Sequence, residues 1–175
     1  MNPAIENLIT RRSIRKFKSD PVPKDLIRQI IEAGLYAPSG RNYQSTIIIA
    51  VTNQELRNKI SKINCRLGGW KDDFDPFYGA PVILIVLANR EYPNYIYDGS
   101  LTMGNILNAA HSLGLGSCWI HRAKQEFDMP EFQEILRSLS IEGNFEGIGH
   151  CALGYADEKL PSPPRRKENR VFYLD

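Results

Sequence analysis

The amino-acid sequence predicts an α+β fold in which one small sheet is packed against several helices. At most four segments are strand-like, at residues 45–52, 80–88, 114–120 and 145–156. A doubly wound parallel sheet usually has more strands, and here helices and strands alternate only loosely. A layered α+β domain therefore fits better. The 175 residues suit one domain with its own core, and neither a repeat nor a linker interrupts them.

Each element is predicted by a local pattern. The segments at 45–52 and 80–88 are short and rich in β-branched residues, and the one at 80–88 is apolar almost throughout, which indicates burial on both faces. Apolar residues spaced three and four apart indicate helices, of which residues 98–113 form the strongest. Helices are predicted within residues 2–12, 23–40, 53–63, 98–113 and 129–139. Residues 64–79 have no clean period and are predicted to be an aromatic, glycine-containing loop of the kind that gates a pocket.

Composition excludes several classes of protein. The formal net charge of +2 is too small to indicate a nucleic-acid binder. The three cysteines are far apart and form no CxxC motif, so neither a zinc site nor a redox pair is expected. No apolar run approaches the length of a membrane span, and no N-terminal signal-like run is present. We expect a cytoplasmic protein with reduced, mostly buried thiols, no metal, and neither a nucleic acid nor a membrane as partner.

The segment "RRSIRK", residues 11–16 and here called the basic segment, has two interpretations. The planar guanidinium groups of arginines match phosphate oxygens, and a serine adds a short neutral donor. Arg11 and Arg15 would share one face if the helix continued through them. The alternative is an ordinary helix C-terminus, where cations are favoured by the helix dipole.

The segment "PSGRNYQ", residues 38–44 and here called the amide segment, supplies neutral donors and acceptors. Ser39, Asn42 and Gln44 would suit a polyol or the edge of a heterocycle. The same residue types are also simply turn formers after a helix. His121 directly follows the strand-like segment "GLGSCWI" and is of interest because sites form at strand ends. The glycines of that segment could alternatively cap the preceding helix. "GIGHCA" (147–152) fits a dinucleotide fingerprint formally, but it is itself strand-like and no helix follows.

No metal-ligand spacing, nucleophile elbow, Cys–His pair or Ser–His pair can be assigned from the sequence. Binding motifs without side-chain chemistry indicate that a cofactor supplies the reaction. Taken in order, "RRSIRKF", "APSGRNYQ", "YGAPVILIV", "DGSLTMGNILNAAHSLGLGSCWI" and "ALGYADEKLPSPPRRK" resemble the nitroreductase family of flavin mononucleotide (FMN) enzymes. The resemblance spans nearly the whole chain.

The resemblance implies a central, mostly antiparallel sheet flanked by helices, in one domain of residues 1–175. It implies an intertwined homodimer with FMN at the interface and an extended C-terminal arm, residues 159–175, on the partner. Arg11, Arg12, Ser13 and Arg15 are expected to hold the phosphate, the ribityl chain and the edge of the ring. Arg165 or Arg166 is expected to return to the phosphate. The full set of expected cofactor-binding residues is Arg11, Arg12, Ser13, Arg15, Pro38, Ser39, Gly40, Asn42, Gln44, Trp119, Ile120, His121, Arg122, Arg165 and Arg166.

The activity that the resemblance implies is hydride transfer from NAD(P)H through flavin N5 to a nitroaromatic, quinone, flavin or enone. The two substrates would use one slot in turn, and the backbone near His121 and Arg122 would donate to N5. Two alternatives stay open at this stage. One is a flavin protein that does not use nicotinamide, such as a carrier, a dehalogenase or a flavin-fragmenting enzyme. The other is a binder of nucleic acid or of an acidic partner that uses the basic clusters.

Overall fold

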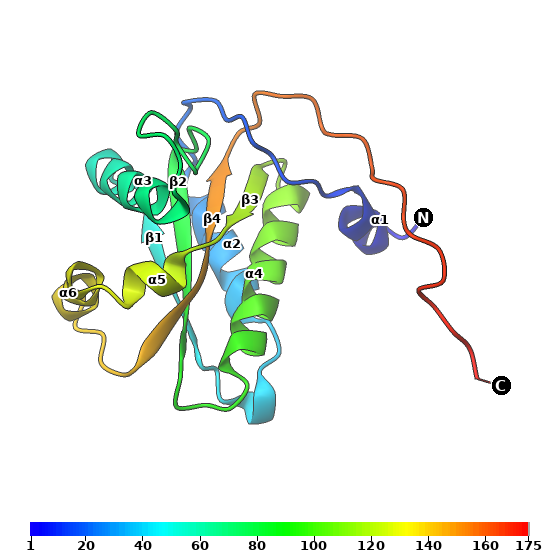
Figure 1. The fold of residues 1–175 in the computed structure, drawn as a ribbon. Coiled ribbons are helices and arrows are strands. Elements are labelled where there is room, and N and C mark those ends of the chain that lie inside the picture. The colour runs from blue at the N-terminus through cyan, green and yellow to red at the C-terminus, as the bar shows by residue number, and fades with distance from the viewer. Residues whose placement is uncertain (175) are drawn as a thin grey trace.

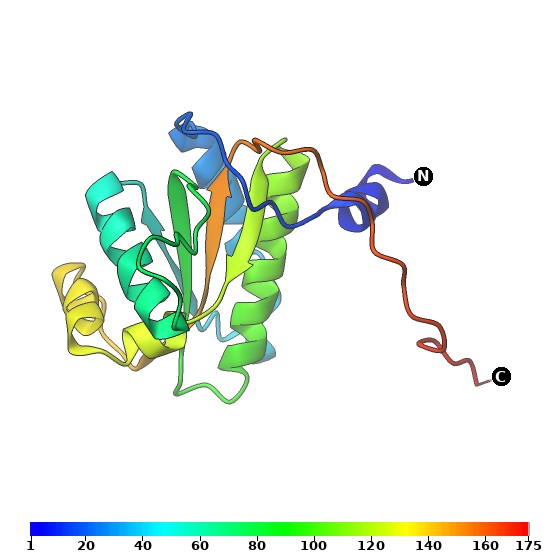
Figure 2. The same ribbon diagram turned by 45° about the horizontal axis from the view of Figure 1, so that its top comes forward.

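A four-stranded sheet lies between two layers of helices (Figures 1 and 2). The structure is a computed structural model and describes residues 1–174. The strands are β1 (Thr46–Val51), β2 (Val82–Asn89), β3 (Gly116–Ile120) and β4 (Phe145–Gly154). Their order is β1-β2-β4-β3, and every neighbouring pair is antiparallel. The α+β prediction, the four strands and the antiparallel sheet are thus confirmed.

The helices cover both faces of the sheet. Helices α2 and α4 pack on one face, and α3, α5 and α6 lie on the other (Figure 1). Their bounds are α1 (Pro3–Thr10), α2 (Lys24–Leu35), the 3₁₀ turn η1 (Gly40–Asn42), α3 (Gln54–Gly68), α4 (Tyr95–Ser112), α5 (Ala123–Phe127) and α6 (Pro130–Ser138).

Strand β2 divides the hydrophobic core in two because its successive side chains point to opposite faces. Ile83, Ile85 and Leu87 enter the core under α3, α5 and α6. Val82, Leu84 and Val86 enter the core under α2 and α4. Every residue of β2 except the last is buried, as the uninterrupted apolar run predicts.

Several predicted boundaries were wrong. Helix α1 ends at Thr10 instead of 12, and α2 ends at Leu35, ahead of Pro38. Helix α4 begins at Tyr95 instead of Asp98, and the short elements η1 and α5 were not predicted.

The predicted loop at 64–79 is partly helical, because α3 continues to Gly68. Gly69 then ends the helix in the left-handed conformation (φ 67°), and its N–H bonds the Arg66 carbonyl. The extension buries Asn64 and Cys65.

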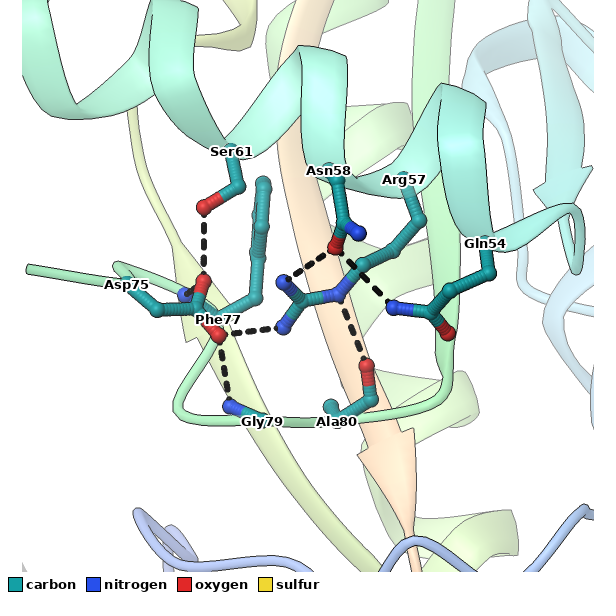
Figure 3. Close-up of polar contacts among 8 residues, drawn as sticks. All are labelled: Gln54, Arg57, Asn58, Ser61, Asp75, Phe77, Gly79 and Ala80. Atoms are coloured by element: carbon teal, nitrogen blue, oxygen red, sulfur yellow. Dashed lines mark hydrogen bonds and ion pairs between the residues drawn. The ribbon is translucent and has the colours of Figure 1, made fainter.

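The rest of that loop is fastened to α3 by a charged network (Figure 3). Arg57 Nη2 lies 2.5 Å from Asp75 Oδ2, and Ser61 donates to the same carboxylate at 2.7 Å. The backbone N–H of Gly79 also donates to it, and Arg57 Nε donates to the Ala80 carbonyl at 2.9 Å. The network therefore fixes the loop on the same side of the sheet as α3.

The two chain ends lie away from the sheet in both views (Figures 1 and 2). Helix α1 has no buried residue, and residues 159–174 contain neither helix nor strand. The apolar side chains near the C-terminus are exposed, Phe172 by 81%. The last residue of the predicted arm, Asp175, lies outside the described residues.

None of the helices in the described part of the chain combines the length and the apolar character needed to span a membrane.

The charged network makes a prediction about stability. Burial would raise the pKa of Asp75, but hydrogen bonds from Arg57 and Ser61 outweigh it and lower that pKa below its ordinary value of 3.8. The carboxylate therefore stabilises the fold above about pH 4, and this contribution is lost as the pH falls through the folded-state pKa. Asp75→Asn should lower the free energy of unfolding by about 2 kcal/mol at pH 7, because the buried guanidinium of Arg57 loses its charged partner. Urea unfolding at pH 7 and pH 3 measures both effects.

Asp73→Asn is the matched control, since Asp73 is exposed and lies in the same loop. It should change the free energy of unfolding by no more than about 0.5 kcal/mol. Equal effects of the two variants would contradict the role given to the network.

Candidate functional site

The basic segment leaves helix α1 and runs along the start of strand β3. Arg11 caps α1 with an extended backbone (φ −54°, ψ 133°). Ser13 then forms an isolated parallel bridge with Ser117, whose carbonyl accepts the N–H of Ile14 at 3.0 Å. Because the helix ends before this segment, Arg11 and Arg15 do not share a helical face.

The two arginines next to α1 differ in what they bind. Arg12 Nη1 donates to the carbonyls of Ile9 (2.8 Å) and Arg11 (2.7 Å), which is the helix-capping role considered from the sequence. Arg11 Nη1 and Arg12 Nε are buried and have no hydrogen-bond partner among the described residues. Buried donors without acceptors are costly, so both are suited to an anionic ligand.

The positive charges of Arg11 and Arg12 affect the pKa of His111 near the end of α4. Its Nε2 lies 2.9 Å from Thr10 Oγ1, which joins α1 to α4. Burial lowers the pKa of His111 below its ordinary value of 6.5, and the charges of Arg11 and Arg12 lower it further. Burial raises the pKa of the Cys118 thiol, and the charges of Arg15 and Arg11 oppose that rise.

The amide segment lies at the other end of α4. The Gly40 N–H donates to Asp98 Oδ1 at 3.0 Å, and Ser45 Oγ donates to Asp98 Oδ2 at 2.9 Å. Within the segment, the Gln44 N–H donates to Ser39 Oγ, and the Gln44 amide donates to Asn42 Oδ1. The side chains of Pro38, Asn42 and Gln44 are exposed, so their polar groups are accessible.

A single chain therefore separates two predicted parts of the site. The basic segment contacts α4 near His111, and the amide segment contacts it near Asp98. Asp98 and His111 are 13 residues apart on α4, which separates them by about 20 Å at 1.5 Å per residue. Residues at its two ends cannot both contact the same small group within one chain.

A cleft of about 760 Å³ opens where β3 ends. It contains three of the predicted residues, Trp119, His121 and Arg122, while Ile120 is buried in the sheet beside it. The rings of Trp119 and His121 are tilted against each other, with centroids 5.9 Å apart. The lining residues of the cleft are Leu67, Ile96, Ser100, Trp119, His121, Arg122, Lys124, Gln125, Glu146, Gly147 and Ile148.

A buried polar network beneath the cleft was missed from the sequence. Asn64, Glu126 and His150 are completely buried. The Asn64 amide donates to Glu126 Oε1 at 2.7 Å and to the His121 carbonyl at 2.9 Å, and His150 Nε2 lies 2.7 Å from Glu126 Oε2. The one available signal was a histidine within the otherwise apolar end of the last strand, because three different elements supply these side chains.

Arg165 and Arg166 are exposed in the extended C-terminal segment. Arg165 Nη2 lies 2.7 Å from Glu168 Oε1, a pair close in sequence. Just before residue 159, Asp157 Oδ2 lies 2.9 Å from Lys16 Nζ, and the Glu158 carboxylate accepts the N–H of Arg15, which ties this part of the chain to the basic segment. The single chain does not place Arg165 or Arg166 against Arg11.

The described residues contain no cluster of three or more metal-ligating side chains. The cysteines are buried and unpaired, and burial raises the pKa of the Cys118 and Cys151 thiols. Nucleophilic thiolate chemistry at these positions is therefore disfavoured.

Comparison with known proteins identifies the family of this chain. The nitroreductase family model matches residues 8–66 and 71–155. The chain belongs to the nitroreductase family. It is 40% identical over 182 residues to an NADPH-flavin oxidoreductase of Vibrio harveyi, covering 99% of this chain and 74% of that protein. It is 29% identical over 199 residues to an FMN reductase [NAD(P)H] of Bacillus subtilis, covering 100% and 74%.

The fold agrees with solved structures of the family. A nitroreductase of Bacteroides fragilis with bound FMN matches with a TM-score of 0.87 and 30% sequence identity, and each chain is covered completely. The family suggested by the ordered motifs of the sequence is therefore confirmed.

The charge of the basic segment can be tested through His111. Arg11→Gln should raise the pKa of His111, because one of the two cations that lower it is removed. A histidine whose folded-state pKa is lowered destabilises the fold when it is protonated, so stability falls below about pH 6.5. This loss should be smaller in the variant. Proton NMR titration of the His111 ring reports the pKa directly.

Arg28→Gln removes an equal charge from α2, where Arg28 pairs with the exposed Asp25 at 3.2 Å. It should leave the titration of His111 unchanged. An unchanged pKa in Arg11→Gln would show that the Arg11 charge does not reach this end of α4.

Proposed function

We propose that this chain is an FMN-dependent oxidoreductase that passes hydride from NAD(P)H to a small oxidised acceptor. The observation that carries the proposal is the pair of buried donors, Arg11 Nη1 and Arg12 Nε, which no described residue satisfies. A phosphate dianion would satisfy both with charge-assisted hydrogen bonds. The matches to an NADPH-flavin oxidoreductase and an FMN reductase support the same assignment.

The residues at hand fit FMN in two places. The basic segment would hold the phosphate through Arg11 and Arg12, while Ser13 and Arg15 would reach the ribityl chain and the ring. At the cleft, the backbone following Ile120 would present a donor toward N5 near His121. When bound, FMN supplies hydride transfer at N5, which explains why no side chain here has to act as a nucleophile.

The protein's own contribution would be binding, orientation and exclusion of water. Cations beside the ring would favour its anionic reduced form, and Arg15 is the candidate. Donor and acceptor would use one slot in turn, and the acceptor would be a nitroaromatic, a quinone, a flavin or an enone. A net charge of +2 does not support a nucleic-acid partner. A cytoplasmic location remains a prediction from the sequence.

We propose further that the site is completed by a second copy of the chain. The length of α4 keeps the amide segment away from the phosphate-binding basic segment within one protomer, and the resemblance to the family implies that Ser39, Gly40 and Asn42 would reach the flavin of the partner. Exposed apolar residues on α4, among them Tyr97 and Leu101, would be covered in such a dimer. The C-terminal arm, residues 159–175, would wrap around the partner and bring Arg165 or Arg166 to the phosphate.

A visible spectrum of the purified protein tests the function. Protein incubated with FMN and freed of excess cofactor should show flavin bands, and anaerobic NADH or NADPH should bleach them. The nicotinamide that bleaches the flavin bands faster is the preferred electron donor. Sedimentation followed at the flavin absorption should place the flavin with a dimer.

Bands that persist with both nicotinamides would favour the flavin carrier or dehalogenase alternative. A protein that takes up no FMN would overturn the proposal. A flavin-loaded monomer would contradict only the shared site.

A further inference from the structure

The guanidinium group of Arg122 is a cation without a carboxylate partner at the wall of the cleft. Within residues 1–174 no ion pair involves Arg122. By contrast, Lys124 of the same cleft lies 3.3 Å from Glu146 Oε1, and Arg90 lies 3.2 Å from Glu146 Oε2. The positive charge that the cleft presents without neutralisation is therefore that of Arg122.

The guanidinium group of Arg122 stacks on the aromatic ring of Trp70. Its guanidinium carbon lies 4.2 Å from the centre of the Trp70 ring. A Cβ added at Gly68 would lie 2.4 Å from that ring, so Trp70 is folded back over the end of α3. Phe74 contacts the ring edge-on, with centroids 5.0 Å apart. Stacking leaves the N–H edges of a guanidinium free to bind an anion in the plane of the group.

The backbone of Arg122 is fixed as well. The residue adopts the left-handed conformation (φ 82°, ψ 0°), which a long side chain rarely takes. On one side, the His121 carbonyl is held by Asn64 of the buried network. On the other side, Ala123 packs so closely on β4 that a Cβ at Gly147 would lie 2.2 Å from its carbonyl. Side chain and backbone are therefore both arranged before a ligand binds.

We propose that Arg122, stacked on Trp70, determines acceptor specificity by binding an anionic group on a planar aromatic acceptor. The apolar residues Leu67 and Ile148 line the same cleft and suit the ring of such a molecule. A preorganised guanidinium pairs with a carboxylate through two parallel hydrogen bonds. The inference rests on the proposed function, since it names the substrate class of that site.

The test compares 4-nitrobenzoate with 4-nitrobenzyl alcohol, which differ in charge but share the nitroaromatic ring. Flavin-loaded protein is reduced with dithionite and mixed with each acceptor, so that use of a nicotinamide is not required. Wild-type protein should be reoxidised by 4-nitrobenzoate with the lower half-saturating concentration. Arg122→Asn should lower the ratio of second-order rate constants, benzoate over alcohol, by about tenfold, the loss of one charge-assisted pair. Asparagine is chosen because it tolerates the left-handed conformation.

Two further variants and a binding measurement separate charge from structure. Arg122→Lys should restore part of the ratio, and Trp70→Leu should lower it by a smaller factor because the charge remains. Lys71→Gln removes a neighbouring charge that does not line the cleft and should leave the ratio unchanged. Titration calorimetry with benzoate should show weakened binding in Arg122→Asn, independently of any turnover.

An unchanged ratio in Arg122→Asn would overturn the inference. So would a change confined to the dependence of flavin reduction on NADH or NADPH concentration, because Arg122 would then bind a phosphate of the dinucleotide. Failure of wild-type protein to bind FMN would instead refute the proposed function, and calorimetry with benzoate would still test the anion subsite.

Discussion

Burial of strands β2 and β4 on both faces is the constraint on which the rest of the structure depends. The centre of the sheet has no solvent-facing side, so helices must cover it twice, α2 and α4 on one face and α3, α5 and α6 on the other. This requirement places α4 along the sheet. The basic segment then lies near His111 at one end of α4, and the amide segment contacts Asp98 near the other end. It also brings α5 and α3 together beneath the end of β3, where the buried network fixes the backbone at His121.

The sequence predicted those features that depend on short-range patterns. All four strands were predicted, β1 and β2 from runs of β-branched residues, and the spacing of apolar residues indicated the major helices. The extension of α3 to Gly68 was missed because it carries Asn64, Cys65 and Arg66, and the burial of Asn64 is compensated by a hydrogen bond to a distant carbonyl. The network of Asn64, Glu126 and His150 was likewise beyond prediction, because only the folded chain brings these residues together.

The basic segment was predicted correctly as a concentration of charge, and the structure shows that its two interpretations are compatible. Arg12 caps α1 through one nitrogen while another nitrogen remains buried without a partner. What the sequence could not show is the separation of the basic and amide segments along α4. That separation, together with the exposed apolar residues of α4 and of the C-terminal segment, supports the two-chain site that the family resemblance implied.

In the proposed site, the unsatisfied donors of Arg11 and Arg12 hold the phosphate of FMN. The most direct measurement is the affinity of wild-type protein and Arg11→Gln for FMN and for riboflavin, which lacks the phosphate. The substitution should weaken FMN binding by about tenfold or more, the scale of a lost charge-assisted hydrogen bond, and should change riboflavin binding little. Equal weakening of both ligands would contradict it, because Arg11 would then act on the fold or on the ring and not on the phosphate.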